Sequence, residues 1–93
     1  MLTLDTNIQI PANLASTLLE EDAVLLNTRT NRYYALDGAG ARLWGLLKEA
    51  KPLREAYKTL LDEFEVEPAQ LEQDVLDLLG QLMENGLVEA VAA

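Results

Sequence analysis

The change in hydrophobic periodicity at Asp37 constrains the fold of this chain more than any other sequence feature. Before Asp37, apolar residues alternate with polar ones or form short runs, and after it they recur every three to four residues. A period of two is typical of a strand with one buried face, and a period near 3.6 is typical of an amphipathic helix. The sequence therefore predicts an N-terminal sheet followed by helices, in one α+β domain over residues 1–93.

Three segments before Asp37 are predicted strands. Residues 2–10 carry mostly apolar side chains at even positions and polar ones at odd positions, which predicts a half-buried strand. Residues 23–27 are an apolar run, and residues 32–36 contain two tyrosines. Turn-forming residues 28–31 separate the last two strands, so we expect a hairpin. The result is a three-stranded antiparallel sheet.

Three helices are predicted after the sheet, each with a start or stop signal. The first covers residues 38–50, Pro52 suits the first position of the second, and Pro68 opens a third that ends at Asn85-Gly86. Three helices beside a hairpin resemble a winged helix-turn-helix. In the connection between the first two strands, residues 14–19 are expected to form a helical turn.

Other apolar and small residues are expected to have packing roles only. Trp44 is expected to anchor the core, and the small residues 38–41 are expected to let the first helix pack closely on the sheet. After the third helix, an apolar tail of Leu87, Val88 and Val91 is expected to return to the core.

Composition excludes most catalytic classes. The chain has 93 residues, a net charge of −9, and neither Cys nor His, so thiolate nucleophiles, imidazole bases and the usual zinc and haem sites are absent. The acidic groups at 20–22 and 62–67 lack the ligand spacing of a calcium loop, and we expect them to be solvated. We therefore expect no enzyme activity, no cofactor and no metal.

The sequence also indicates where the protein is located and whether it binds nucleic acids. No apolar segment is long enough to span a membrane, and the first residues lack the basic region of a signal peptide, so we expect a cytoplasmic protein. A pI near 4.2 argues against phosphate-rich partners. A DNA-binding winged helix needs a basic recognition helix, whereas residues 69–85 contain no Lys or Arg.

Residues 32–36 are a candidate binding strand. They contain no Pro, Lys or Gly, which are residues that often prevent an exposed strand edge from pairing. An extended peptide could therefore add there as a further strand. Tyr34 and Leu36 share one face, and Tyr33 and Ala35 share the other. At least one tyrosine is therefore expected to be structural, and the sequence leaves open which.

The third helix is the second candidate element. Its main apolar stripe consists of Leu71, Val75, Leu78, Leu79 and Leu82. Leu76 and Met83 widen that stripe, and Asp74, Asp77 and Gln81 lie on the other flank. Two interpretations stay open: the extra apolar residues contact a neighbouring element, or they border a groove for apolar side chains of a partner, with carboxylates near its basic residues.

Several stretches together resemble the PqqD-like family of recognition elements for ribosomally synthesised, post-translationally modified peptides. The resemblance covers about residues 20 to 90, and it rests on 24–27, 32–37, 40–47 and 71–88. It implies a non-catalytic domain that binds the leader of a precursor peptide, added as a strand beside residues 32–36 and the third helix. The residues it implicates are Arg32, Tyr33, Tyr34, Ala35, Leu36, Leu71, Asp74, Val75, Leu78 and Leu79.

The resemblance is strongest to the stand-alone leader-binding protein of lasso-peptide biosynthesis. It implies that the partners are the precursor leader and a leader peptidase, which is a cysteine protease subunit, with the macrocyclase as a further candidate. The alternatives are a PqqD-type peptide chaperone for a radical SAM or other modifying enzyme, and a structural subunit whose open strand edge is buried in a permanent complex.

Overall fold

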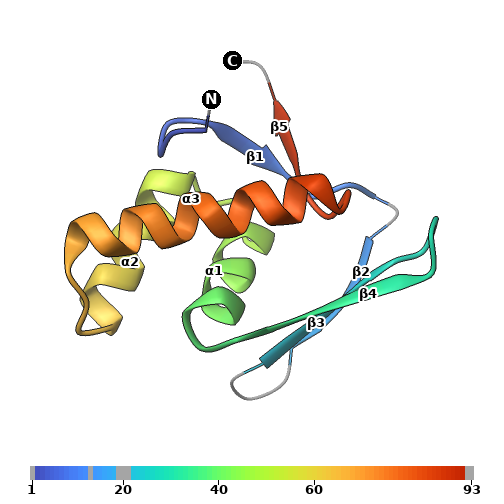
Figure 1. Cartoon of the computed structure of the whole chain (residues 1–93), viewed down its shortest axis with the longest axis horizontal. Helices are drawn as coiled ribbons and strands as arrows, with labels where there is room; N and C mark the ends of the chain where they lie inside the picture. Colours follow the sequence, from blue (N-terminus) through green and yellow to red (C-terminus); the bar gives the residue numbers. More distant parts are fainter. Residues whose placement is uncertain (1, 13, 19–21, 92–93) are drawn as a thin grey trace.

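A three-stranded antiparallel sheet, three helices and a small two-stranded sheet make up the structure (Figure 1). The computed structural model describes residues 2–12, 14–18 and 22–91. In chain order the elements are β1 (Asn7–Gln9), β2 (Leu14–Leu18), β3 (Asp22–Asn27), β4 (Arg32–Asp37), α1 (Gly38–Lys48), α2 (Leu53–Glu63), α3 (Pro68–Glu84) and β5 (Glu89–Val91). The predicted α+β class, with a sheet followed by three helices, is confirmed.

The predicted hairpin is confirmed as β3 and β4. The two strands pair antiparallel from Asn27 opposite Arg32 to Asp22 opposite Asp37. In the turn, Asn31 adopts a left-handed backbone with φ of 60°, which Asn tolerates better than most residues. Its N–H donates a hydrogen bond to the carbonyl oxygen of Asn27 at 2.8 Å, so local turn chemistry sets the register of the hairpin.

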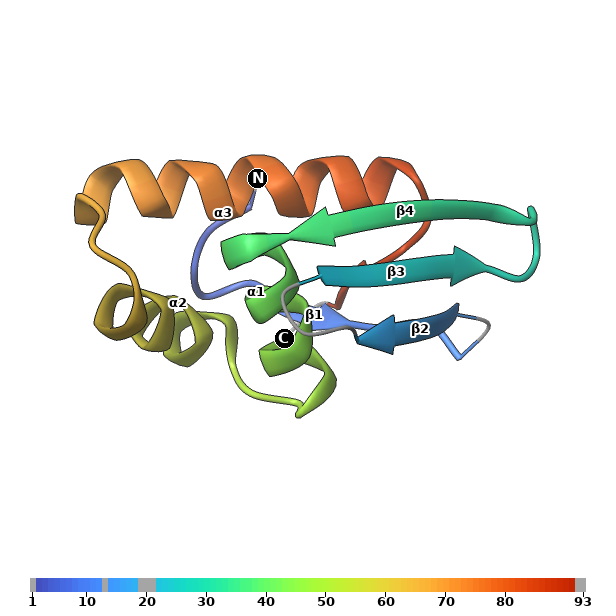
Figure 2. The ribbon, with the colours of Figure 1, turned by 90° about the horizontal axis from the view of Figure 1, so that it is seen from below.

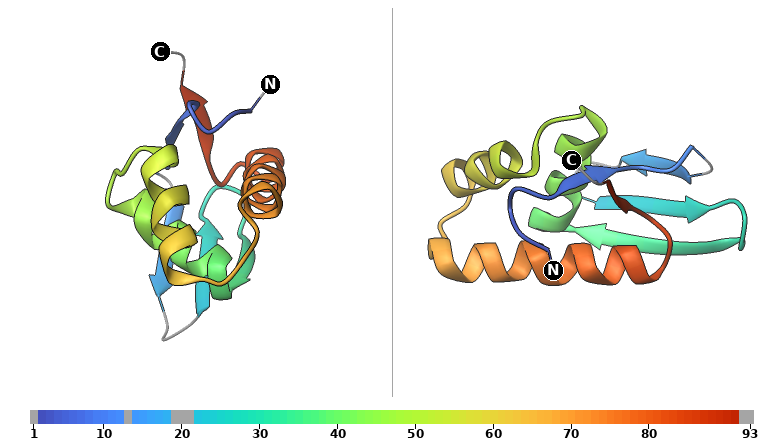
Figure 3. Two further views of the ribbon diagram at one scale, coloured as in Figure 1. Left: turned by 90° about the vertical axis from the view of Figure 1, so that its left-hand side faces the viewer. Right: turned by 90° about the horizontal axis from the view of Figure 1, so that it is seen from above.

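Two N-terminal predictions are wrong. Residues 14–18 form strand β2, not a helical turn, and pair along their whole length with β3. Residues 2–10 do not join this sheet: only Asn7–Gln9 is a strand, and it pairs with β5. The left view of Figure 3 shows this second sheet apart from the first. Sheet pairing is non-local, so the pattern of a short segment does not name its partner. Asn13, Leu19, Glu20 and Glu21 lie outside the described residues.

The helices pack as their apolar stripes predict. α1 contacts β3 and β4, α2 contacts α1, and α3 contacts α2. Pro68 occupies the first turn of α3, and Gly86 follows the helix with φ of 71°, a conformation that glycine adopts without strain. Trp44 is fully buried at the centre of the core, which confirms its predicted role.

Segments near the two ends of the chain pack against the helices. Leu87 and Val88 are buried, as predicted, but Val91 in β5 is 41% exposed, so that part of the prediction is wrong. Arg54 on α2 donates hydrogen bonds of 2.9 and 3.1 Å to the carboxylate of Asp5. These hydrogen bonds, and the positive charge of Arg54, hold the pKa of Asp5 below its usual value.

Candidate functional site

β4 is an edge strand of the three-stranded sheet. Within the part of the chain that the structure describes, the strand order is β2-β3-β4, so β4 pairs on one side only. Figure 2 shows α3 running alongside the other side of β4. An edge strand presents N–H and C=O groups without a strand partner, and no proline in β4 interrupts that row. The edge beside α3 is therefore the surface on which a further strand could pair.

The two faces of β4 differ in exposure. Leu36 is 7% exposed and Tyr34 is half-buried, whereas Tyr33 is 76% exposed and Ala35 is also exposed. The predicted pairing of side chains on each face is confirmed. The structural tyrosine is Tyr34, which settles the question that the sequence left open. Tyr33 is free to contact a partner on the outer face of the sheet.

Side chains connect β4 to α3 and α1. The hydroxyl of Tyr34 donates a hydrogen bond to Oε1 of Gln81 at 2.9 Å. Near the other end of β4, a Cβ atom at Gly40 would lie 3.3 Å from Leu78 Cδ2 and 3.7 Å from Leu36 Cδ2. Glycine at position 40 therefore allows the first turn of α1 to lie close to both α3 and β4. This agrees with the close packing that the small residues 38–41 predict.

Asp74 lies on the side of α3 that faces β4. Asp74, Leu78 and Gln81 are spaced four and three residues apart, which places them in one row along the helix. Gln81 contacts Tyr34, so the row is directed toward the strand. The Asp74 side chain is exposed, and its Oδ1 accepts a hydrogen bond from Nε2 of Gln70 at 2.8 Å. A carboxylate is thus available on this side of the helix.

The other implicated residues of α3 are part of the core. Leu71 and Val75 are 4% exposed and Leu79 is fully buried, so all three pack against the protein itself. Leu76 and Met83 are half-buried and contact the same core. At 100° per residue, Leu76 lies about 160° from Leu78 around the helix, which places it away from β4. For Leu76 the structure favours contact with a neighbouring element.

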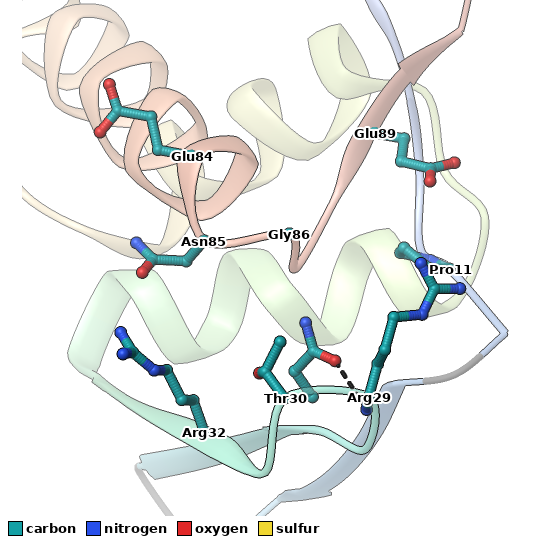
Figure 4. Close-up of a pocket in the computed structure, with 9 residues that line it drawn as sticks. Pro11, Arg29, Thr30, Arg32, Glu84, Asn85, Gly86 and Glu89 are labelled. Atoms are coloured by element: carbon teal, nitrogen blue, oxygen red, sulfur yellow. Dashed lines mark hydrogen bonds between the residues drawn. The ribbon is translucent and has the colours of Figure 1, made fainter.

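An open polar pocket lies where the β3–β4 turn approaches the end of α3 (Figure 4). Its volume is about 690 Å³, and its lining residues are Pro11, Asn27, Arg29, Thr30, Arg32, Glu84, Asn85, Gly86 and Glu89. Arg32, the first residue of β4, belongs both to this pocket and to the candidate strand. Sequence reasoning did not single out Arg29, although it and Arg32 are the only basic residues before position 42.

The fold and the strand edge together define a small α+β domain in which an accessible edge strand runs beside a long helix. The model of the family described as coenzyme PQQ synthesis protein D (PqqD) matches residues 22–88. The chain belongs to the PqqD family. That match begins with β3 and ends at the buried residue Val88, so it includes both candidate elements.

Two solved structures are similar to this chain. TbiB1, solved in complex with the TbiA(beta) leader peptide, is 32% identical, and the alignment covers 91% of this chain and 99% of TbiB1, with a TM-score of 0.85. A lasso peptide synthetase B1, solved as a complex with the leader peptide, is 24% identical over 89% of this chain and 98% of that one, with a TM-score of 0.79; at this identity the likeness supports the fold. Among curated proteins, no significant match is found.

Proposed function

We propose that this chain binds the leader segment of a ribosomally synthesised precursor peptide by adding it as a strand to the free edge of β4, beside α3. The observation that carries the proposal is this free edge in a PqqD-family domain. The relative TbiB1, which matches this chain over almost its whole length, is known in complex with a leader peptide. Main-chain pairing would supply affinity, and nearby side chains would supply specificity.

The side chains along the edge suit an extended peptide with apolar residues. Leu78 and the partly buried ring of Tyr34 lie between the strand and the helix. Each main-chain hydrogen bond contributes about 0.5–1.5 kcal/mol net, so a few such bonds need apolar contacts to reach micromolar affinity. Exposed Tyr33 on the outer face remains available to a second partner of the complex.

The composition of the chain favours binding of the peptide over cutting or modifying it. It contains no Cys, no His and a single Ser. Its proposed role is therefore presentation: the bound leader is delivered to a separate leader peptidase in lasso-peptide maturation, with the macrocyclase as a further candidate partner. The match to the PqqD family favours one second candidate, a peptide chaperone for a radical SAM or other modifying enzyme.

Direct titration tests the proposal. A fluorescent TbiA(beta) leader peptide, and the leader of a precursor encoded beside this chain, are titrated with the purified protein while anisotropy is measured. We expect saturable binding of at least one leader and none of a scrambled peptide of the same composition. If a folded monomer binds neither leader at tens of micromolar, and adding the candidate peptidase does not restore binding, the proposal is wrong.

Substitution of Asp74 tests the helix side of the site. Asp74→Ala is expected to weaken binding of a leader that carries Lys or Arg by about two- to fivefold, because an exposed ion pair contributes little more. Glu72→Ala is the matched control, since Glu72 is an exposed acidic residue of the same helix about 160° away around the axis. Equal affinity for both variants would identify Asp74 as a solvated carboxylate without a role in binding.

A further inference from the structure

β2 is the second edge strand of the three-stranded sheet. Within the described residues it pairs with β3 alone, and Figure 2 shows its other edge on the side of the sheet that is farthest from α3. The strand, Leu14–Leu18, contains no Pro and no charged residue, although such residues commonly protect an exposed edge from pairing. The sheet therefore has a second edge that can accept a strand, opposite the edge of β4.

The main-chain groups of Leu14, Ser16 and Leu18 point away from β3. The N–H of Leu14 donates a hydrogen bond of 3.2 Å to the carbonyl oxygen of Pro11, which is not part of β3. The direction of the main-chain groups alternates from one residue to the next along an antiparallel strand, so Ser16 and Leu18 share the orientation of Leu14. Ser16, in the middle of the strand, thus presents an N–H and a C=O together at the free edge.

The sequence of β2 is nearly symmetric about Ser16. Leucines occupy both ends of the strand, and the small residues Ala15 and Thr17 flank the serine. If two copies of β2 pair antiparallel with a two-fold axis at Ser16, then Ser16 lies opposite itself and Leu14 lies opposite Leu18 of the second copy. The two Ser16 residues then exchange both of their hydrogen bonds, and the carbonyl of Leu14 faces the N–H of Leu18.

The exposure of Leu18 also favours this pairing. Its side chain is 52% exposed, although leucine is mostly buried in folded proteins. Leu18 and Leu14 lie on the face of the sheet that packs against the core, because they pair with the buried residues Ala23 and Asn27. In the symmetric pair, each Leu18 lies beside Leu14 of the second copy on that face. The pairing therefore covers an exposed apolar side chain and places no like charges opposite each other.

We infer that this chain forms a reversible two-fold dimer in which the free edges of β2 pair and join the two sheets into one. The inference is independent of the proposed function, and β4 with its neighbour α3 stays at the two outer ends of the joined sheet. One short strand pair buries far less than the roughly 800 Å² per partner of a standard interface. Each copy also carries a net charge of −9. The dimer is therefore weak, and salt strengthens it by screening the repulsion.

Sedimentation equilibrium of the purified chain, from micromolar to millimolar concentration, tests for the dimer. We expect a monomer–dimer equilibrium that tightens as NaCl is added. Leu18→Lys is expected to weaken association about tenfold or more, because an edge lysine opposes strand pairing. Gln73→Lys adds the same charge at an exposed position of α3 and is the matched control, expected to associate as the unmodified chain does. A chain that stays monomeric throughout, or a dimer that Leu18→Lys leaves unchanged, would overturn the inference.

Single cysteines test the register, since the chain has no cysteine of its own. Ser16→Cys is expected to form a disulfide-linked dimer on mild oxidation, because the paired Cα atoms lie about 5.5 Å apart. In Thr17→Cys, the two cysteines lie about 7–8 Å apart on a diagonal, beyond the reach of a disulfide, so cross-linking is expected to be at least tenfold slower. A mixture of Ala15→Cys and Thr17→Cys chains is expected to link one variant to the other. Equal rates for Ser16→Cys and Thr17→Cys would contradict the two-fold axis at Ser16.

Discussion

A leader peptide carrying single N-methyl groups is expected to lose affinity at every second position across the segment that pairs with β4. In an antiparallel or parallel ladder, alternate residues of an added strand direct their N–H groups toward the neighbouring strand. A methyl group there removes one hydrogen bond and places a carbon atom against the edge. We expect at least a tenfold loss at those positions, which corresponds to about 1.4 kcal/mol or more, and little change at the positions between.

The pattern along the peptide distinguishes strand addition from other modes of binding. Anisotropy titrations of the N-methyl series give the pattern directly, and an alanine series of the same peptide serves as the control for side-chain effects. Losses spaced three and four residues apart in the alanine series would indicate a peptide bound as a helix. A uniform small loss at every N-methyl position would contradict pairing with the free edge of β4.

Val75→Asp is expected to unfold the domain. Val75 is 4% exposed and lies on the face of α3 that packs into the core. An ionised carboxylate there would lack both water and a partner. Such a substitution costs several kcal/mol, and the total stability of a small domain is about 5–10 kcal/mol. Circular dichroism is expected to show a broad or absent thermal transition where the unmodified protein shows a cooperative one.

Gln73→Asp is the matched control for that substitution. Gln73 is exposed on the same helix and donates a hydrogen bond to Asp77 at 2.8 Å. The change adds the same charge without burying it and replaces that exposed contact with a like-charge pair, which costs only a few tenths of a kcal/mol. We therefore expect a thermal midpoint within a few degrees of the original. If Val75→Asp instead stays cooperatively folded and loses only leader binding, then Val75 lines the peptide site directly, as the family resemblance implies. That outcome would show that the helix moves from β4 when the peptide binds.

The candidate strand and the helix beside it could be predicted from the sequence, but which of their side chains the core covers could not. Residues 32–36 and the residues of α3 were identified from alternation and from helical spacing, and both elements form as predicted. Helical spacing groups Leu71, Val75, Leu78 and Leu79 in one apolar arc. Only packing separates half-buried Leu78, next to Gly40, from the three that the core covers.

The sequence by itself determined the elements whose signals are local. Pro68 and Gly86 bound α3, the turn at Asn31 closes the hairpin, and the periodicity after Asp37 produces helices, because each of these effects acts within a few residues. The tertiary structure alone decided the partners of the two N-terminal strands: β2 pairs with β3, and β1 pairs with β5. It also placed Arg29 and Arg32 around one pocket with residues of the end of α3. Pairing and pocket formation depend on residues far apart in the chain, whose contacts exist only after the core has packed.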